Sequence, residues 1–220
     1  MLIESFAAPM FATNCWILAS APGSECIVID PGMPDVSVQV AAIIAEFSLK
    51  PVAVVATHGH LDHTFSIRPV AEGYGIPAYI HSQDRESLIH PDRLVSAEFA
   101  ATLSAMEFIE PSDVRELRNG DVIELVGLSM RAIHAPGHTR GSLMFEINNE
   151  ILVSGDVLFA GSIGRTDQPT GSAKDMEETL RKKVLPLADH LRVLPGHGRT
   201  TTIGDERKNN PYLNSIKGRY

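Results

Sequence analysis

The stretch VVATHGHLDHTFS, residues 54–66, joins a run of small apolar residues to a dense group of imidazoles and one carboxylate. The preceding residues extend the run to PVAVVAT (51–57), which is short and uniformly apolar and therefore predicts a buried, parallel strand. Side chains that follow a buried strand lie at the rim of a sheet, where loops converge on a ligand. Four side chains able to bind a metal occupy this position: His58, His60, Asp62 and His63.

Three more motifs repeat this arrangement, because each places a histidine or an aspartate beside glycine just after a predicted strand. They are APGHTRG with His138, SGD with Asp156 and LPGHG with His197. A fourth, DPG at 30–32, also follows an apolar run but lacks a good ligand geometry of its own. Imidazole nitrogen and carboxylate oxygen without thiolate suit Zn²⁺, Fe²⁺ or Mn²⁺. The sequence therefore predicts a metal site assembled from several loops.

The pattern around these motifs alternates short apolar strands with amphipathic helices. The predicted strands are 2–6, 14–20, 25–30, 51–57, 77–81, 121–125, 128–135, 141–147, 150–156 and 191–195. The predicted helices are 35–47, 64–74, 82–90, 173–184 and one from about Asp205. The pattern weakens between 91 and 112, which we interpret as an excursion between two halves, with a helix inside a long crossover.

The second half repeats the order of elements of the first half. This repetition predicts an α/β protein, an αββα sandwich of two packed mixed sheets with helices on the outside. We expect 1–220 to form a single domain built from two similar halves, about 1–90 and 113–220.

Composition narrows the possible partners. The 220 residues carry a formal net charge of −8, which argues against nucleic acid, because that binding depends on clustered Lys and Arg. No apolar run reaches the roughly 18 residues of a membrane span, and the N-terminal residues do not resemble a signal peptide, so we expect a cytoplasmic protein with no membrane partner. Cys15 and Cys26, without a C-x-x-C motif, predict buried reduced thiols rather than disulfides or a thiolate zinc site.

The motifs THGHLDH, PGHTRGS, SGDVLF and PGHG resemble, in order and spacing, those of the metallo-β-lactamase superfamily. Within it, GDVLFAGSIGRTD and GHGRTTTIGDERKNNPYL are similar to the glyoxalase II group, the hydroxyacylglutathione hydrolases and their shorter bacterial relatives. The resemblance implies two metal ions, zinc by expectation, with iron or manganese as alternatives. One ion would be held by His58, His60 and His138 and the other by Asp62, His63 and His197, with Asp156 bridging both.

The reaction that this resemblance implies is hydrolysis of a small hydroxyacyl thioester such as S-lactoylglutathione. A hydroxide shared by the two cations, held beside the catalytic carboxylates Asp62 and Asp156, would attack the carbonyl. No serine or cysteine nucleophile is required, and the sequence contains no G-x-S-x-G motif. The expected partner is a small-molecule thioester.

The chain departs from the long glyoxalase II enzymes in its substrate-binding residues. We expect their C-terminal helical region with basic residues to be absent or vestigial after His197, so the sequence resembles a short form. A glutathione-binding lysine of the long enzymes aligns with Arg165, which predicts a substrate-binding cation there. Their nearby tyrosine aligns with Asp167, so Arg165 and Asp167 either bind substrate or pair with each other. A further basic and polar run either reaches the pocket or is a solvated face: Arg207, Lys208 and Asn210.

Several alternatives stay open from the sequence. Persulfide dioxygenases share this resemblance but bind one iron, here through His58, His138 and Asp156, and a lactonase would use the same hydrolytic chemistry. The net charge argues against a ribonuclease, and the absence of an export signal argues against a secreted β-lactamase. A scaffold without activity fits poorly, because every ligand position is occupied. Asp62 also suits an N-cap of the following helix. Four other histidines are read as solvated or capping residues: His81, His90, His134 and His190.

Overall fold

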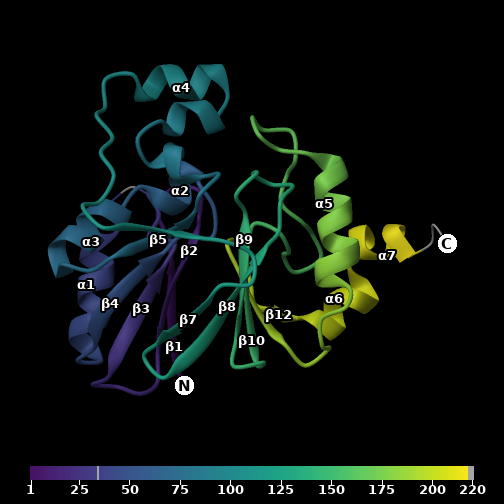
Figure 1. The fold of residues 1–220 in the computed structure, drawn as a ribbon, viewed down its shortest axis with the longest axis horizontal. Coiled ribbons are helices and arrows are strands. Elements are labelled where there is room, and N and C mark those ends of the chain that lie inside the picture. The colour runs from purple at the N-terminus through teal and green to yellow at the C-terminus, as the bar shows by residue number, and fades with distance from the viewer. Residues whose placement is uncertain (34, 218–220) are drawn as a thin grey trace.

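The computed structural model describes residues 1–33 and 35–217, so residue 34 and the last three residues of the predicted domain, 218–220, lie outside the described part. Within that part, two six-stranded sheets pack face to face, and helices cover the two outer faces (Figure 1). The predicted αββα sandwich is thereby confirmed. No helix among the described residues is both long and apolar enough to cross a membrane.

The first sheet has the order β1-β2-β3-β4-β5-β6. Its first three strands form an antiparallel meander, and β3 to β6 run parallel. Helices α1 and α3 cover its outer face (Figure 1) through residues such as Val40 and Val70, which pack against Val28 and Val54. The bounds are β1 Leu2–Ala7, β2 Asn14–Ala19, β3 Glu25–Ile29, α1 Ser37–Glu46, β4 Lys50–Val55, α3 Ile67–Tyr74, β5 Ala78–His81 and β6 Val114–Leu117.

The second sheet has the order β12-β11-β10-β9-β8-β7, with β10 and β11 parallel and the other pairs antiparallel. Met176 of α5 and Leu213 of α7 pack on its outer face against Leu152 and Val193. Helix α5 continues into one π-helical turn, η3. The bounds are β7 Val122–Leu125, β8 Leu128–His134, β9 Leu143–Ile147, β10 Ile151–Gly155, α5 Ala173–Thr179, η3 Leu180–Val184, β11 Arg192–Pro195, β12 Thr201–Thr202, α6 Ile203–Asn209 and α7 Pro211–Lys217.

The main apolar layer lies between the two sheets. Alternate residues of β3 and β4, such as Ile27 and Val55, point inward and meet Met130, Phe145 and Val153 of the second sheet. Because successive side chains of a strand point to opposite faces, the other residues of β3 and β4 serve the outer layer under α1 and α3. This double burial accounts for the uniformly apolar sequence of β4.

The structure differs from the predicted elements at several places. Strand β6 was not predicted, and because it pairs in parallel with β5, the chain leaves the first sheet only after Leu117. The predicted helix 64–74 begins later, as α3, and a separate short helix, α2 (Leu61–Thr64), precedes it. The predicted helix 82–90 is only a 3₁₀ turn, η1 (Arg85–Leu88). The excursion 91–112 contains η2 (Pro91–Leu94) and α4 (Ala97–Leu103), which lies above one end of the sandwich (Figure 1).

Candidate metal centre

The loop after β4 carries the first pair of histidines into the interior. His58 is 1% exposed and His60 is 7% exposed, and α2 begins directly after them. His60 occupies the N-cap position of α2 with an extended backbone, φ −65° and ψ 142°. The N-cap role predicted for Asp62 is therefore wrong. Asp62 lies in the first turn of α2, where its Oδ2 accepts a hydrogen bond from Thr13 Oγ1 at 2.7 Å.

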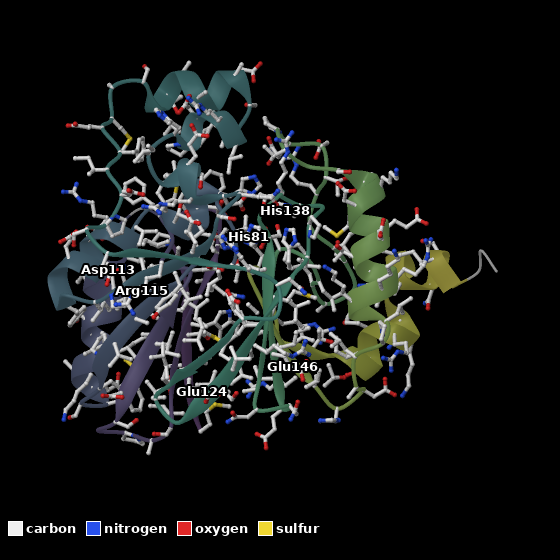
Figure 2. The ribbon with its side chains drawn as sticks, in the orientation of Figure 1. His81, Asp113, Arg115, Glu124, His138 and Glu146 are labelled. Carbon is white, nitrogen blue, oxygen red and sulfur yellow. The ribbon has the colours of Figure 1, made fainter. Side chains whose placement is uncertain are left out.

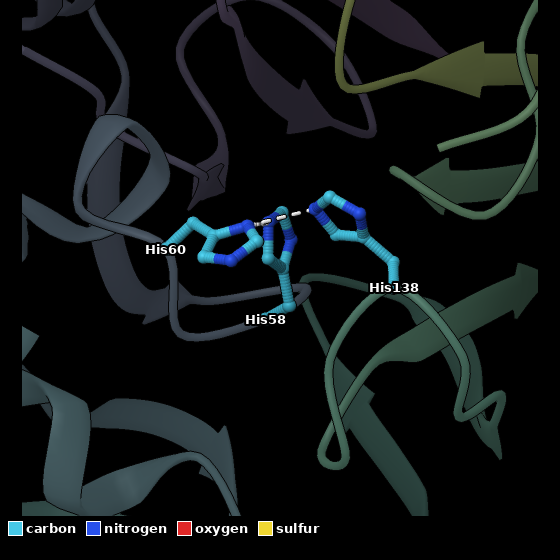
Figure 3. A group of neighbouring side chains, drawn as sticks. All are labelled: His58, His60 and His138. Atoms are coloured by element: carbon cyan, nitrogen blue, oxygen red, sulfur yellow. Dashed lines mark hydrogen bonds between the residues drawn. The ribbon is translucent and has the colours of Figure 1, made fainter. Parts of the chain in front are cut away.

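His138, in the loop between β8 and β9, meets this pair from the second sheet. Its Nε2 lies 2.7 Å from Nδ1 of His60, which lies 3.1 Å from Nε2 of His58. Figure 3 shows the three rings turned towards one another, two from one loop and one from another. His138 lies at the end of the molecule under α4, whereas Glu124 and Glu146 lie at the opposite end of the second sheet (Figure 2). We call His58, His60 and His138 the first group.

A second group consists of Asp62, His63 and His197. Nε2 of His63 lies 3.4 Å from Asp62 Oδ2 and 3.3 Å from Nε2 of His197. Asp156, which follows β10, faces both groups: its Oδ2 lies 3.5 Å from His138 Nε2 and 3.4 Å from His197 Nε2. All seven predicted ligand side chains thus lie together, in the two sets that the resemblance implied. Their binding of metal in these roles stays a prediction.

Hydrogen bonds behind the rings determine which nitrogens are free of protons. His138 Nδ1 lies 2.7 Å from the carbonyl oxygen of Arg165, which can only accept, so Nδ1 carries the proton and Nε2 presents a lone pair. Thr57 Oγ1 donates to Asp30 and so accepts from His58 Nδ1, which leaves His58 Nε2 unprotonated. Both lone pairs converge on His60 Nδ1, which can donate at most one hydrogen.

This convergence is the test of whether the residues fit a metal ion. Nitrogen lone pairs that face one another in a buried space repel unless a proton or a cation lies between them. Asp156 Oδ1 is also buried and has no hydrogen-bond partner among the described residues. Nitrogen and oxygen donors in this arrangement fit a divalent transition metal, so the centre is a metal-binding cluster.

The two groups differ in their protonation. Burial, and then the neighbouring ring of His138, lower the pKa of His60 to about 3, which keeps it neutral and able to bind a metal. Burial disfavours the charged form of His63 too, but the carboxylates of Asp62 and Asp156 outweigh it and raise the pKa of His63 to about 9. The same two carboxylates overcome burial at His197 and raise its pKa to about 10. The facing carboxylates therefore raise the pKa of both histidines of the second group, opposite to the shift at His60.

Two buried aspartates that were not predicted as ligands hold the loops in place. Asp30, in the DPG motif, accepts from the Thr57 backbone N–H at 2.7 Å and lies 2.9 Å from Nδ1 of His63, which fixes that ring. Asp84 accepts from the backbone N–H of Gly59 and of Gly141, each at 2.8 Å. Asp30 could be suspected from the sequence, because the DPG motif follows a predicted strand. Asp84 could not, because it lies within the predicted helix 82–90 and no local motif surrounds it.

The other polar residues singled out from the sequence lie outside the cluster. Arg165 pairs with Asp167 through two bonds of 2.7 and 2.8 Å, so their mutual pairing is observed, although Arg165 also borders the cavity described below. Asn210 donates to Glu206 and to the carbonyl oxygen of Ser162, away from the cavity. Neither Arg207 nor Lys208 borders the cavity. Two of the four other histidines pair with each other, because the ring of His81 stacks on that of His134.

A cavity of about 390 Å³ opens over both groups. His58 and His63 lie beneath it, almost fully buried, while the other five members of the cluster form its floor: His60, Asp62, His138, Asp156 and His197. A cavity with a metal-binding floor can hold a small molecule against the cations, which is the arrangement of a hydrolytic active site.

Comparison with known proteins agrees with this geometry. The model of the family "Metallo-beta-lactamase superfamily" matches residues 8–197. An uncharacterised protein of Mycobacterium tuberculosis is 42% identical over 223 residues, covering 98% of this chain and 99% of the relative. Hydroxyacylglutathione hydrolase GloC of Haemophilus influenzae is 32% identical over 216 residues, covering 98% and 99%. The crystal structure of TTHA1623 in a di-iron-bound form superposes with a TM-score of 0.78 at 30% identity, covering 97% and 100%. The chain therefore belongs to the metallo-β-lactamase superfamily.

Proposed function

We propose that this protein is a metal-dependent hydrolase of small thioesters, of the glyoxalase II type. The observation that carries the proposal is the pair of ligand groups facing one another across Asp156 on the floor of a small cavity. In this proposal the first group holds one cation, the second group holds the other, and Asp156 contacts both. The likeness to the Haemophilus hydroxyacylglutathione hydrolase supports S-lactoylglutathione as the first substrate to test.

Zinc is the metal that we propose, and iron and manganese suit the same donors. The di-iron form of TTHA1623 supports a site for two ions and keeps iron open. When bound, the cations would lower the pKa of a water molecule and polarise the substrate carbonyl.

The carboxylates of the chain would accept hydrogen bonds from the attacking water and so orient it. Despite burial, His63 and the hydrogen bonds from neighbouring side chains hold the pKa of Asp62 well below its usual range, so this carboxylate stays ionised and can accept a hydrogen bond from the attacking water. Thr13 fixes its orientation through Oδ2. The water oxygen forms a bond to the carbonyl carbon, the C–S bond breaks, and the sulfur leaves as a thiolate. One proton of the water passes to the departing sulfur, and the other leaves with ionisation of the carboxylic acid product. A thiol of ordinary pKa, about 8.5, leaves without a dedicated acid.

Neither cysteine of the chain can serve as an alternative nucleophile. Cys15 and Cys26 are fully buried in the outer layer under α1 and α3. Burial raises the pKa of the Cys26 thiol to about 12 and also raises that of Cys15, so neither forms a reactive thiolate at neutral pH. Attack by water is the route that these residues support.

The experiment is to follow thiol release from S-lactoylglutathione by the zinc-loaded protein. We expect the parent to hydrolyse this substrate and the activity of His60→Ala to be lower by at least about a hundredfold. Changing a residue that only supports a metal ligand already costs about 10- to 100-fold in metal affinity or activity, and His60 is a proposed ligand itself. His190→Ala is the matched control, since His190 is exposed and its Nε2 lies 2.8 Å from the carbonyl oxygen of Asn149, outside the cluster.

Two results would contradict the proposal. If His60→Ala retains the parent rate, the assigned ligands are wrong. The second contradicting result is that protein purified without added metal contains one iron per chain and consumes oxygen with a glutathione persulfide. That is the behaviour of a dioxygenase rather than a hydrolase.

A further inference from the structure

The cavity over the metal centre has two unlike sides. Its floor carries the histidines and aspartates of the cluster, and most of the other lining residues form an apolar wall, which Ser96, Arg165 and Gln168 interrupt. The wall residues are Phe11, Met33, Leu61, Leu94, Val95 and Phe99. Nothing in the proposed hydrolysis itself requires this wall, because the reacting atoms would lie on the polar floor.

Segments far apart in the sequence build this wall. Phe11 lies in the turn between β1 and β2, Met33 follows β3, and Leu94 and Phe99 belong to η2 and α4 of the excursion. Phe99 and Leu61 belong to a small apolar cluster of their own, separate from the layers of the sandwich. The excursion therefore gives the cavity an apolar side that the two sheets do not supply.

Phe11 is the clearest sign that the wall serves a ligand. Its backbone is left-handed, with φ 64°, and that of Ala12 is too, with φ 55°, a conformation that bulky residues rarely adopt. Yet the side chain is 52% exposed at the cavity and contacts Phe99 edge to face, with ring centroids 5.9 Å apart. An aromatic ring held over a cavity in this way gains little from folding and is available to a bound molecule.

The charged side chains around the cavity also favour a substrate with an apolar part. Arg165 is the one lysine or arginine among the described residues that line it. Its guanidinium already forms a two-bonded pair with Asp167, and both side chains are mostly exposed, at 60% and 68%. Glutathione carries two carboxylates and an ammonium group, and among the described residues that line the cavity the one guanidinium that could receive a carboxylate is already paired.

We propose that the substrate carries an apolar arm beside its scissile bond and that this arm lies against Phe11, Leu94 and Phe99. The inference rests on the proposed thioester hydrolysis and specifies its substrate class. The cavity volume of about 390 Å³ equals the space of about 13 water molecules, enough for an arm of roughly six carbon atoms beside the reacting group. The arm belongs either to the acyl group or to the thiol.

The test compares two series of thioesters with the zinc-loaded protein. In one series the acyl group grows from acetyl to octanoyl on the neutral thiol N-acetylcysteamine, and in the other an acetyl group is carried by alkanethiols of growing length. We expect kcat/KM to rise by up to about fourfold per added methylene in one series, until about six carbons fill the cavity. The series that rises identifies the side of the arm.

The outcomes separate this inference from the proposed function. Hydrolysis with no gain from length in either series, or a preference for S-lactoylglutathione over every neutral thioester, overturns the apolar arm while leaving thioester hydrolysis intact. Absence of hydrolysis with all thioesters overturns the proposed function, and the inference falls with it.

Phe11→Asn tests the wall directly, since asparagine tolerates the left-handed backbone and the residue is too exposed to stabilise the core. We expect the ratio of kcat/KM for the hexanoyl and acetyl substrates to fall about tenfold. Val38→Asn is the control, because Val38 is 75% exposed on α1 and should keep the parent ratio. An unchanged ratio in Phe11→Asn overturns the proposal.

A second readout does not depend on turnover. Thioethers that match the hexanoyl and acetyl substrates lack the carbonyl and cannot be cleaved. By calorimetry we expect the longer thioether to bind at least about tenfold more tightly to the parent, and this difference to shrink in Phe11→Asn. Equal affinities of the parent for the two thioethers would contradict the inference.

Discussion

Asp84 joins the two loops that carry the first group. Its Oδ2 accepts from the Gly59 N–H, between His58 and His60, and from Thr139 Oγ1, next to His138. The carboxylate is 2% exposed and its acceptor positions are filled by these donors and by Gly141, so it acts as a rigid link. It touches no ligand ring, and we regard it as a positioning residue.

Replacing Asp84 by asparagine keeps the shape but turns one acceptor oxygen into a donor that faces another donor. We expect zinc affinity to fall about 10- to 100-fold, as is usual for residues that support metal ligands. Competition with a chromophoric chelator measures this affinity. Asp167→Asn is the control, because that carboxylate is exposed and pairs with Arg165 away from the ligand rings. An unchanged affinity for Asp84→Asn, with folding intact, would contradict a positioning role.

At this scale the sequence predicted which candidate ligand side chains lie together, and it missed the aspartates that hold their loops. His58, His60, Asp62 and His63 are recognisable because they are close together and follow an apolar strand. Asp84 is recognisable only by partners 25 and 55 residues away, at Gly59 and Thr139, and no local pattern encodes that distance.

At the scale of elements, the apolar pattern predicted the strands and helices that are buried. The predicted strand 51–57 appears as β4 at Lys50–Val55, and the predicted helix 35–47 as α1 at Ser37–Glu46. Strand β6 was missed because it is four residues long and half exposed, so it has neither the length nor the alternation of a buried strand. The two-residue β12 is defined by pairing with β11 alone, which no sequence pattern marks.

The ends of β5 and β8 meet through His81 and His134, whose rings stack with centroids 4.2 Å apart. Burial, and then the neighbouring His134, lower the pKa of His81 from 6.5 to about 4. The folded chain therefore favours neutral His81, and the unfolded chain binds more protons between pH 6.5 and about 4. The contribution of His81 to stability is present above pH 6.5 and is lost as pH falls through this window.

We therefore expect the free energy of unfolding of the parent to fall more steeply between pH 6.5 and 4 than that of His81→Asn. Urea unfolding of the metal-free proteins at several pH values measures the two slopes. His190→Asn, at an exposed histidine, should follow the parent. Equal slopes for the parent and His81→Asn would show that His81 is not held neutral.

At the scale of the whole molecule, the metal centre lies on the seam between the two sheets. Each group takes members from both: His58 follows β4 and His138 follows β8, while His63 lies on α2 and His197 follows β11. The start of β2 crosses the seam as well, since the side chain of Asn14, its first residue, donates to the carbonyl oxygens of Pro195 and Gly198. We propose that 1–220 is one domain, because neither half holds a complete group.

At Gly196, beside the metal centre, the packing leaves no room for a side chain. A Cβ added at Gly196 would lie 2.1 Å from Asp156 Oδ1 and 2.7 Å from the ring of His63. The sequence predicted that strand ends converge, which follows from the topology of such sheets. It could not predict the closeness of the contact, because that depends on how the two sheets pack.

The most direct test of a two-ion centre shared by both halves is the number of zinc ions bound by the metal-free protein, titrated at pH 7.5 and checked by elemental analysis. The account predicts two zinc ions per chain for the parent. It predicts one for Asp62→Ala combined with His197→Ala, because only the second group is removed. A parent that binds one ion, or a double variant that still binds two, would contradict the account.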